Sequence, residues 1–424
     1  MRTLVVAWAL VAAACSDVRI VDDDGHAQAG GSDGAGAQNV GGASVNAGGG
    51  VGSGASGSGG TSVLECASGA LALVGDVERV PLLKEQTAHQ PMGLVALPNG
   101  GALLAAEVTT PAADIERGPG LVELSPWGQW PPPISSPLPL PFRSNGFAFA
   151  SDDDGPFIVT PTDEGVVLLS GLPENKSDGS AISSAVNPSV LFAVAGGGRY
   201  LVRTHTPVDG RSTLLWPGGT QASSSNDICV SNFSDTAVPI DGGFLVSAAA
   251  VVPDGLPCPE TGSVDITRYD VSPAGELSAV IVQTIPETEP FFGGLVRRSD
   301  GAWHFTMQPD ATGTLSGVVQ RVDMAGNSVG DAMPVGLLFG VGAVGDGFAV
   351  SVMGEGGGHT ISVFDASGEL RSTGTIEPFS SAWTTWGMRF LTSPDQSSLL
   401  IAIDAIDTEY QERVLLARLD CAAP

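Results

Sequence analysis

Runs of apolar residues alternate with short polar turns along most of this chain, and the stretch from Phe291 to Gly330 shows the pattern well. One apolar run ends at the turn Ser299-Asp300-Gly301, and a second run begins at Ala302. After a polar loop, a third run from Gly317 to Val322 ends in a turn at Asp323 to Asn327. Apolar runs joined by an Asp-Gly turn predict a β-hairpin, so this stretch predicts three consecutive strands.

The same pattern recurs along the rest of the chain. The turns fall near residues 99, 154, 197, 242, 300, 346 and 395, which gives a mean step of about 49 residues. A period of this size is typical of β-propellers, in which each blade is a four-stranded antiparallel sheet. A β-helix would need a period of about twenty residues, and a pair of β-sandwiches would not repeat one turn chemistry seven times. No segment shows a sustained 3.6-residue apolar period, so we expect little helix.

The segments Asp241-Gly242-Gly243-Phe244-Leu245-Val246 and Arg268-Tyr269-Asp270-Val271-Ser272-Pro273-Ala274-Gly275 resemble blades of secreted bacterial propeller repeats. The resemblance covers about 360 residues. It implies an all-β, seven-bladed propeller over residues 63–424, and it says almost nothing about activity, because propellers host unrelated functions.

A propeller must join its two ends, and the seventh repeat supplies only three clear strands, the last of which ends at Leu419. A surplus strand precedes the first repeat, at Ala70 to Val74 or at Val77 to Leu83. We expect this N-terminal strand to pair beside Val414 to Leu419 and to close the propeller.

The chain has five cysteines. Antiparallel pairing of the N-terminal strand with the last strand would bring Cys66 and Cys421 within bonding reach, which predicts one disulfide. Cys229 and Cys258 flank the inner hairpin of the fourth repeat and its proline-rich loop, and we expect a second disulfide between them. The fifth cysteine, Cys15, follows an apolar run.

Residues 1–14 predict an export signal, because Leu4 to Ala14 is apolar but too short to span a bilayer. Small residues directly before Cys15 resemble the lipobox of bacterial lipoproteins, although Ala12 stands where a leucine is usual. The alternative is an ordinary cleaved signal with an incidental cysteine. Residues 15–62 are rich in Gly, Ser and Ala and predict a flexible tether. This order resembles Gram-negative surface lipoproteins, so we expect the cell envelope, at the outer membrane or the cell surface.

Charge narrows the choice of partners. The chain carries 18 basic and 46 acidic residues, a formal net charge of -28. This balance argues against a nucleic acid or an anionic membrane surface as a partner, because phosphate binding needs clustered Lys and Arg. We interpret the charge as a contribution to solubility and expect a monomer that touches the membrane only through its lipid.

The candidates for a site in the central channel are His89, His205 and Glu107, although a lone histidine is more often structural. The run Asp152 to Gly155 offers oxygens for calcium, but a solvated hairpin turn is the simpler interpretation. No metal site or cofactor is assigned otherwise. The two function hypotheses are a non-enzymatic scaffold that binds a protein or a glycan, and a propeller-type hydrolase or lyase with a metal in the channel.

Overall fold

The computed structural model describes residues 64, 66–80, 87–110, 116–124, 130–131, 138–139, 146–174, 179–184, 188–206, 210–218, 220–222, 235–249, 262–309, 312–354, 358–377, 384–393, 395–406 and 412–422. All regular elements in these ranges are β-strands, as the absence of a helical period predicted. A search of the same ranges finds no helix with the length and hydropathy needed to cross a membrane.

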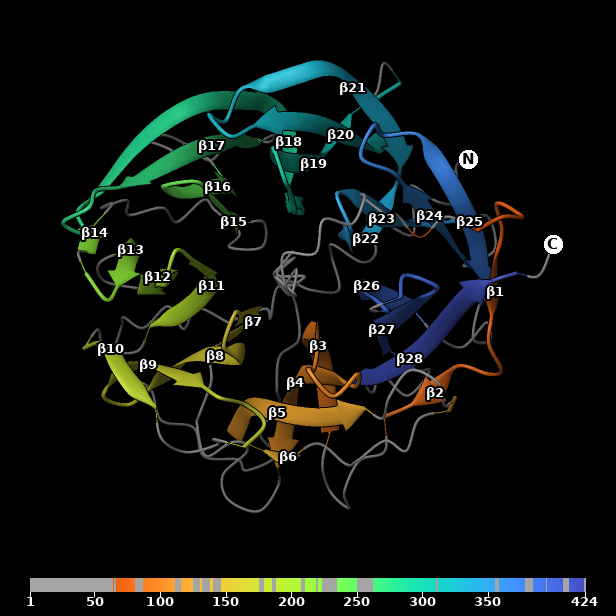
Figure 1. Ribbon diagram of the computed structural model, residues 1–424, viewed down its shortest axis with the longest axis horizontal. Helices are drawn as coiled ribbons and strands as arrows, with labels where there is room; N and C mark the ends of the chain where they lie inside the picture. The colour runs from red at the N-terminus through yellow and green to blue at the C-terminus, as the bar shows by residue number, and fades with distance from the viewer. Residues whose placement is uncertain are drawn as a thin grey trace, which may run out of the picture. The chain divides into compact units, whose positions relative to one another are not determined.

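The first three repeats each form an antiparallel four-stranded sheet (Figure 1). The first sheet contains β3 (Thr87–Ala96), β4 (Ala102–Thr110), β5 (Glu116–Leu124) and β6 (Leu138–Pro139). The second contains β7 (Ala148–Asp152), β8 (Gly155–Thr162), β9 (Gly165–Ser170) and β10 (Ser180–Ser183). The third contains β11 (Ser189–Gly196), β12 (Arg199–Thr206), β13 (Gly210–Trp216) and β14 (Thr220–Ala222).

The remaining strands belong to two larger hydrogen-bonded sheets. One contains β15 (Thr236–Ile240), β16 (Gly243–Ala249), β17 (Gly262–Val271), β18 (Leu277–Arg298), β19 (Gly301–Pro309), β20 (Leu315–Asp323) and β21 (Ser328–Gly336). The other contains β22 (Leu338–Val344), β23 (Gly347–Met353), β24 (His359–Phe364), β25 (Leu370–Ile376), β26 (Thr384–Thr392), β27 (Ser398–Ile406) and β28 (Glu412–Cys421), together with β1 (Leu71–Leu73) and β2 (Glu78–Arg79).

Two local features join repeats that the sequence pattern predicted as separate sheets. β18 continues for 22 residues, so its beginning pairs with β17 and its end pairs with β19. β22 and β26 meet through one parallel pair, Gly340 with Met388. A Cβ atom at Gly340 would lie 2.8 Å from Met388 Cβ, so the absence of a side chain permits this close approach.

The hairpin turns lie where the sequence pattern placed them. Each of the seven turns joins two antiparallel strands, from β3–β4 to β26–β27. The glycine after the turn is required by close packing in several of them. A Cβ atom at Gly243 would lie 1.9 Å from the carbonyl oxygen of Tyr269, and one at Gly301 would lie 2.0 Å from that of Val322. At these two turns the third strand of the sheet lies too close for any side chain, whereas a Cβ atom at Gly155 or Gly242 would meet nothing within 4 Å.

The first strands of successive hairpins contact one another in cyclic order. β3 contacts β7, β7 contacts β11, β11 contacts β15, and β15 contacts β18. β18 contacts β22, β22 contacts β26, and β26 contacts β3 again. The architecture is therefore β-propeller-like.

The hydrophobic core is divided into layers between neighbouring sheets. One layer packs Val95 and Leu103 of the first sheet against Phe149 and Ile158 of the second. The next layer packs Phe157 of the second sheet against Val202 of the third. Each sheet thus buries apolar side chains on both faces, which accounts for the near-continuous apolar runs in the sequence.

The N-terminal segment pairs with the last strand, as the sequence predicted. Leu71 pairs with Cys421 and Leu73 with Leu419, while Glu78 and Arg79 pair with Leu416 and Leu415. Both segments proposed from the sequence, Ala70 to Val74 and Val77 to Leu83, therefore contribute a short strand to the same edge. Figure 1 shows β1 beside β28, although they are at opposite ends of the domain sequence.

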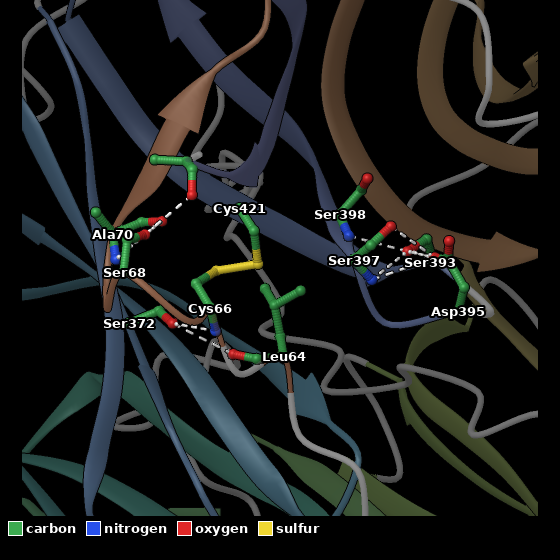
Figure 2. The surroundings of a disulfide bond; sticks show 11 residues. Leu64, Cys66, Ser68, Ala70, Ser372, Ser393, Asp395, Ser397, Ser398 and Cys421 are labelled. Atoms are coloured by element: carbon green, nitrogen blue, oxygen red, sulfur yellow. Dashed lines mark hydrogen bonds between the residues drawn. A yellow bond between two sulfur atoms is a disulfide. The ribbon is translucent and has the colours of Figure 1, made fainter. Parts of the chain in front are cut away.

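A disulfide joins Cys66 to Cys421, which confirms the predicted bond (Figure 2). Ser372 holds the same segment from the neighbouring strand β25. Its Oγ accepts a hydrogen bond of 3.2 Å from Cys66 N and donates one of 3.4 Å to Leu64 O. Cys15, and the expected pair Cys229 and Cys258, lie outside the described residues.

Candidate functional site

The structure places two of the three predicted site residues on one hairpin. Between the pairs Ala88–Val108 and Pro91–Ala106 the register of β3 and β4 shifts, so His89 and Gln90 stand opposite the single residue Glu107. This bulge lies at the end of the hairpin remote from its turn. Glu107 is half-buried.

The third predicted residue, His205, lies in a different sheet. It is half-buried near the end of β12, where its cross-strand neighbours are Ser189 and Arg211. Each of the three residues therefore lies at the end of its strand that is remote from the β3–β4 or β11–β12 turn. Their role as a channel site stays a prediction.

Sequence reasoning missed a buried group of charges beside His205. Asp235, directly before β15, lies between two arginines of the preceding sheet. Its Oδ2 is 3.3 Å from Arg203 Nε and 3.9 Å from Arg211 Nε. The side chains are 7%, 1% and 1% exposed for Arg203, Arg211 and Asp235. Because a buried charge is costly unless it is paired, this carboxylate binds the third sheet to the fourth repeat.

A second buried polar contact joins the fourth and fifth repeats. Ser247 Oγ of β16 lies 2.8 Å from His304 Nε2 of β19, and Leu295 N donates a hydrogen bond of 2.8 Å to Thr236 Oγ1. His304 is 1% exposed. Burial lowers the pKa of His304 to about 4, so the ring is neutral near pH 7. The pair is shielded from solvent and packs the fourth repeat against the fifth.

A third contact lies within the sixth repeat. Ser351 Oγ of β23 is 3.0 Å from His359 Nδ1 of β24, and the Phe339 ring approaches the imidazole edge-on with a centroid distance of 5.5 Å. Burial lowers the pKa of His359 to about 4. Both serine–histidine pairs are thus buried and neutral, and a sequence scan cannot recognise them because their partners come from the register of strands.

Arg389 joins the last inner strand to the first. Its Nε donates a hydrogen bond of 3.5 Å to Met92 O of β3, and its Nη1 donates one of 3.2 Å to Met388 O. Burial lowers the pKa of Arg389 to about 10, while the charge of Asp404 acts in the opposite direction. The guanidinium stays charged at neutral pH, so this contact also holds two sheets together.

The acidic turn considered for calcium uses its first carboxylate within the protein. Asp152 Oδ1 accepts a hydrogen bond of 2.9 Å from Asp154 N, and Asp152 Oδ2 accepts one of 2.5 Å from the Tyr200 hydroxyl. Burial, and then this bond to Asp152, raises the pKa of Tyr200. Across the described ranges, no group of three or more His, Cys, Asp or Glu side chains is placed to hold a metal ion.

Comparison with known proteins gives only distant likenesses. No protein-family model and no curated protein matches the chain. Among solved structures, a Dyadobacter fermentans protein of unknown function has 12% sequence identity and a TM-score of 0.45, covering 83% of this chain and 99% of its own. The subtype N11 neuraminidase-like protein of A/flat-faced bat/Peru/033/2010 has 11% identity and a TM-score of 0.37, covering 84% of this chain and 94% of its own. GH43B of the Bacteroides ovatus xyloglucan PUL has 11% identity and a TM-score of 0.31, covering 81% of this chain and 88% of its own.

Proposed function

We propose that this chain is an exported lipoprotein whose seven-bladed β-propeller binds a protein or glycan partner at the cell envelope without catalysis. The blade count is supported by seven hairpins whose first strands contact in cyclic order. Closure is supported by the pairing of β1 and β2 with β28. The location is supported by the sequence alone, through the apolar leader, Cys15 and the tether.

One observation carries the choice of a scaffold over an enzyme: buried polar side chains hold neighbouring repeats together. Asp235 holds Arg203 and Arg211 of another sheet, and Ser247 contacts His304 across two repeats. Side chains used in this way are enclosed by packing, which favours a rigid surface. Burial also lowers the pKa of His304 to about 4, whereas a general base works best with a pKa near the working pH.

The test of the function is a turnover assay on the full mature chain. A panel of chromogenic glycosides, esters and lactones is offered with and without added Ca²⁺, Zn²⁺ and Mg²⁺, and a glycan array is read in parallel. We expect binding without turnover. Metal-dependent turnover that disappears in Glu107→Gln or His205→Ala would overturn the scaffold and support the hydrolase.

The anchor is tested separately by membrane fractionation of Cys15→Ser. We expect the wild-type chain in the outer-membrane fraction as a monomer after detergent extraction. The variant should be released or left uncleaved. Mature chain that stays in the membrane fraction without Cys15 would contradict lipidation.

A further inference from the structure

The inner turn of the first repeat carries an asparagine where the turns of later repeats carry an aspartate. Asn99-Gly100 lies between β3 and β4 (Figure 1). The turns of the fourth, fifth and sixth repeats read Asp241-Gly242, Asp300-Gly301 and Asp346-Gly347. Asn99 is exposed to solvent. An asparagine followed by glycine is reactive, because glycine has no Cβ atom to shield its backbone nitrogen from the preceding side-chain amide.

The turn holds the two groups of such a reaction next to each other. Asn99 Oδ1 accepts a hydrogen bond of 2.9 Å from Gly101 N. This bond closes a ring that contains both the Asn99 Cγ and the Gly100 nitrogen, so the side chain curls back over its own peptide. The same bond stabilises the negative charge that develops on Oδ1 when a nucleophile attacks Cγ.

The surroundings of Gly100 leave room for the attack. Its φ is 79°, and a Cβ atom built there would meet nothing within 4 Å. The Gly100 N–H donates a hydrogen bond of 3.0 Å to Leu97 O, and this proton must leave before the nitrogen can attack. The reaction therefore requires the turn to release one hydrogen bond, and its rate should rise with pH.

We propose that Asn99 is a site of spontaneous deamidation in the folded protein. The Gly100 nitrogen forms a bond to Asn99 Cγ and the bond from Cγ to Nδ2 breaks. Nδ2 leaves as ammonia, with a proton that balances the one lost from Gly100. One water molecule then opens the resulting succinimide and gives an aspartate or an isoaspartate at position 99. The inference is independent of the proposed binding function.

An aspartate at position 99 fits the turn. In three other turns of this protein an aspartate Oδ1 accepts a hydrogen bond from the backbone N–H two residues later, as Asn99 does. The pairs are Asp152 with Asp154 at 2.9 Å, Asp323 with Ala325 at 2.9 Å and Asp365 with Ser367 at 2.7 Å. An isoaspartate would instead lengthen the backbone inside the hydrogen bond of 2.9 Å from Leu97 N to Gly101 O. The folded turn therefore favours the aspartate product.

Asn327 is an internal control in the turn between β20 and β21. The next residue, Ser328, carries a side chain and pairs with Val322 in the sheet. Asn327 Nδ2 lies 3.4 Å and 3.3 Å from the two carboxylate oxygens of Asp323. Attack on this amide would be hindered by the Ser328 side chain, and the adjacent carboxylate would oppose the negative charge of the intermediate. We expect Asn327 to stay unmodified.

The experiment incubates the full mature chain at neutral and at mildly alkaline pH and follows tryptic peptides by mass spectrometry. Cleavage at Lys84, Arg117, Arg143 and Arg321 places Asn99, Asn145 and Asn327 on separate peptides. The other Asn-Gly pair, Asn145-Gly146, has its asparagine outside the described residues and is read separately. Circular dichroism checks that the chain stays folded. We expect the Asn99 peptide to change from amide to acid, faster at the higher pH.

Two glycine variants test the role of the neighbouring nitrogen. Gly100→Ala should slow the reaction at Asn99 at least about tenfold, because the added methyl group shields the attacking nitrogen. Gly330→Ala is the matched control, since Gly330 also has positive φ and open surroundings. It should leave the rate at Asn99 within about twofold. Asn99→Asp should unfold at the same temperature as the wild-type chain.

Several results would overturn the inference. These are no conversion at Asn99 in the folded chain, equal conversion at Asn99 and Asn327, or equal rates at Asn99 in Gly100→Ala and Gly330→Ala. A clear loss of thermal stability in Asn99→Asp would contradict the fit of the product to the turn.

Discussion

The Cα atoms of Cys66 and Cys421 lie 5.1 Å apart although 355 positions separate the two residues in the sequence. The bond between them closes nearly the whole domain into one covalent loop and ties a short strand to the last one. β1 has only three residues, so hydrogen bonds alone hold it weakly.

The double variant Cys66→Ser/Cys421→Ser should therefore lose stability while keeping its fold. The chain-entropy argument gives roughly 5 kcal/mol as an upper figure for a loop of this length. Thermal unfolding by circular dichroism measures the loss, and limited proteolysis should cut first before β3. An unchanged melting temperature with an unchanged digestion pattern would show that β1 and β2 are held by packing alone.

Removing the buried carboxylate should destabilise the domain far more than removing an exposed one. In Asp235→Asn, Arg203 and Arg211 are left with less compensating charge, and the expected loss is about 3–5 kcal/mol. The matched control is Asp270→Asn, because the Asp270–Arg268 pair is 41% and 39% exposed. Its loss should stay below about 1 kcal/mol. Urea unfolding at pH 7 measures the loss in the free energy of unfolding for both variants. Similar losses in the two variants would contradict the argument that burial makes Asp235 more important.

Stability should fall between pH 6.5 and pH 4 because of two buried histidines, His304 and His359. Burial lowers the folded-state pKa of each to about 4, so the unfolded chain takes up protons in this window before the folded chain does. The contribution of each is complete above pH 6.5 and is lost as the pH falls toward 4, by roughly 3 kcal/mol per histidine as an upper figure.

Urea unfolding at pH 7 and pH 4.5 measures the effect, and His304→Gln should reduce the difference between the two values. Burial alone would raise the pKa of Asp365, but bonds from Ser367, Glu369 and Arg371 lower it to about 2, so its titration falls below this window. A pH dependence that is identical in the variant would refute the assignment to His304.

Two glycines with positive φ allow the cost of backbone strain to be compared with the cost of a steric clash. Gly301 has φ of 147° and a Cβ atom there would meet Val322 O, whereas Gly330 has φ of 74° with nothing within 4 Å. Gly330→Ala should lose about 1 kcal/mol from backbone strain alone. Gly301→Ala should lose several times more, because the neighbouring strand must move. Equal losses in thermal unfolding would mean that β19 and β20 adjust freely.

The sequence predicted the features that depend on local residue patterns. The Asp-Gly turn at Asp300-Gly301 gives a hairpin because few residues tolerate that backbone, and seven similar turns give the repeat. The pairing of the N-terminal segment with the last strand was also predictable, because the last repeat lacked a strand and a surplus strand preceded the first repeat. The contacts of Asp235 and His304 could not be predicted, because they join residues of different repeats and no local sequence pattern encodes how two repeats pack. The continuity of β18 was missed for the same reason.

The disulfide also sets the path of mechanical load. Tension applied between residue 66 and residue 421 passes through one covalent bond, and none of it needs to cross the hydrogen bonds of β1, β2 or β28. A pull on the chain before Cys66 therefore meets an attachment that does not unzip strand by strand.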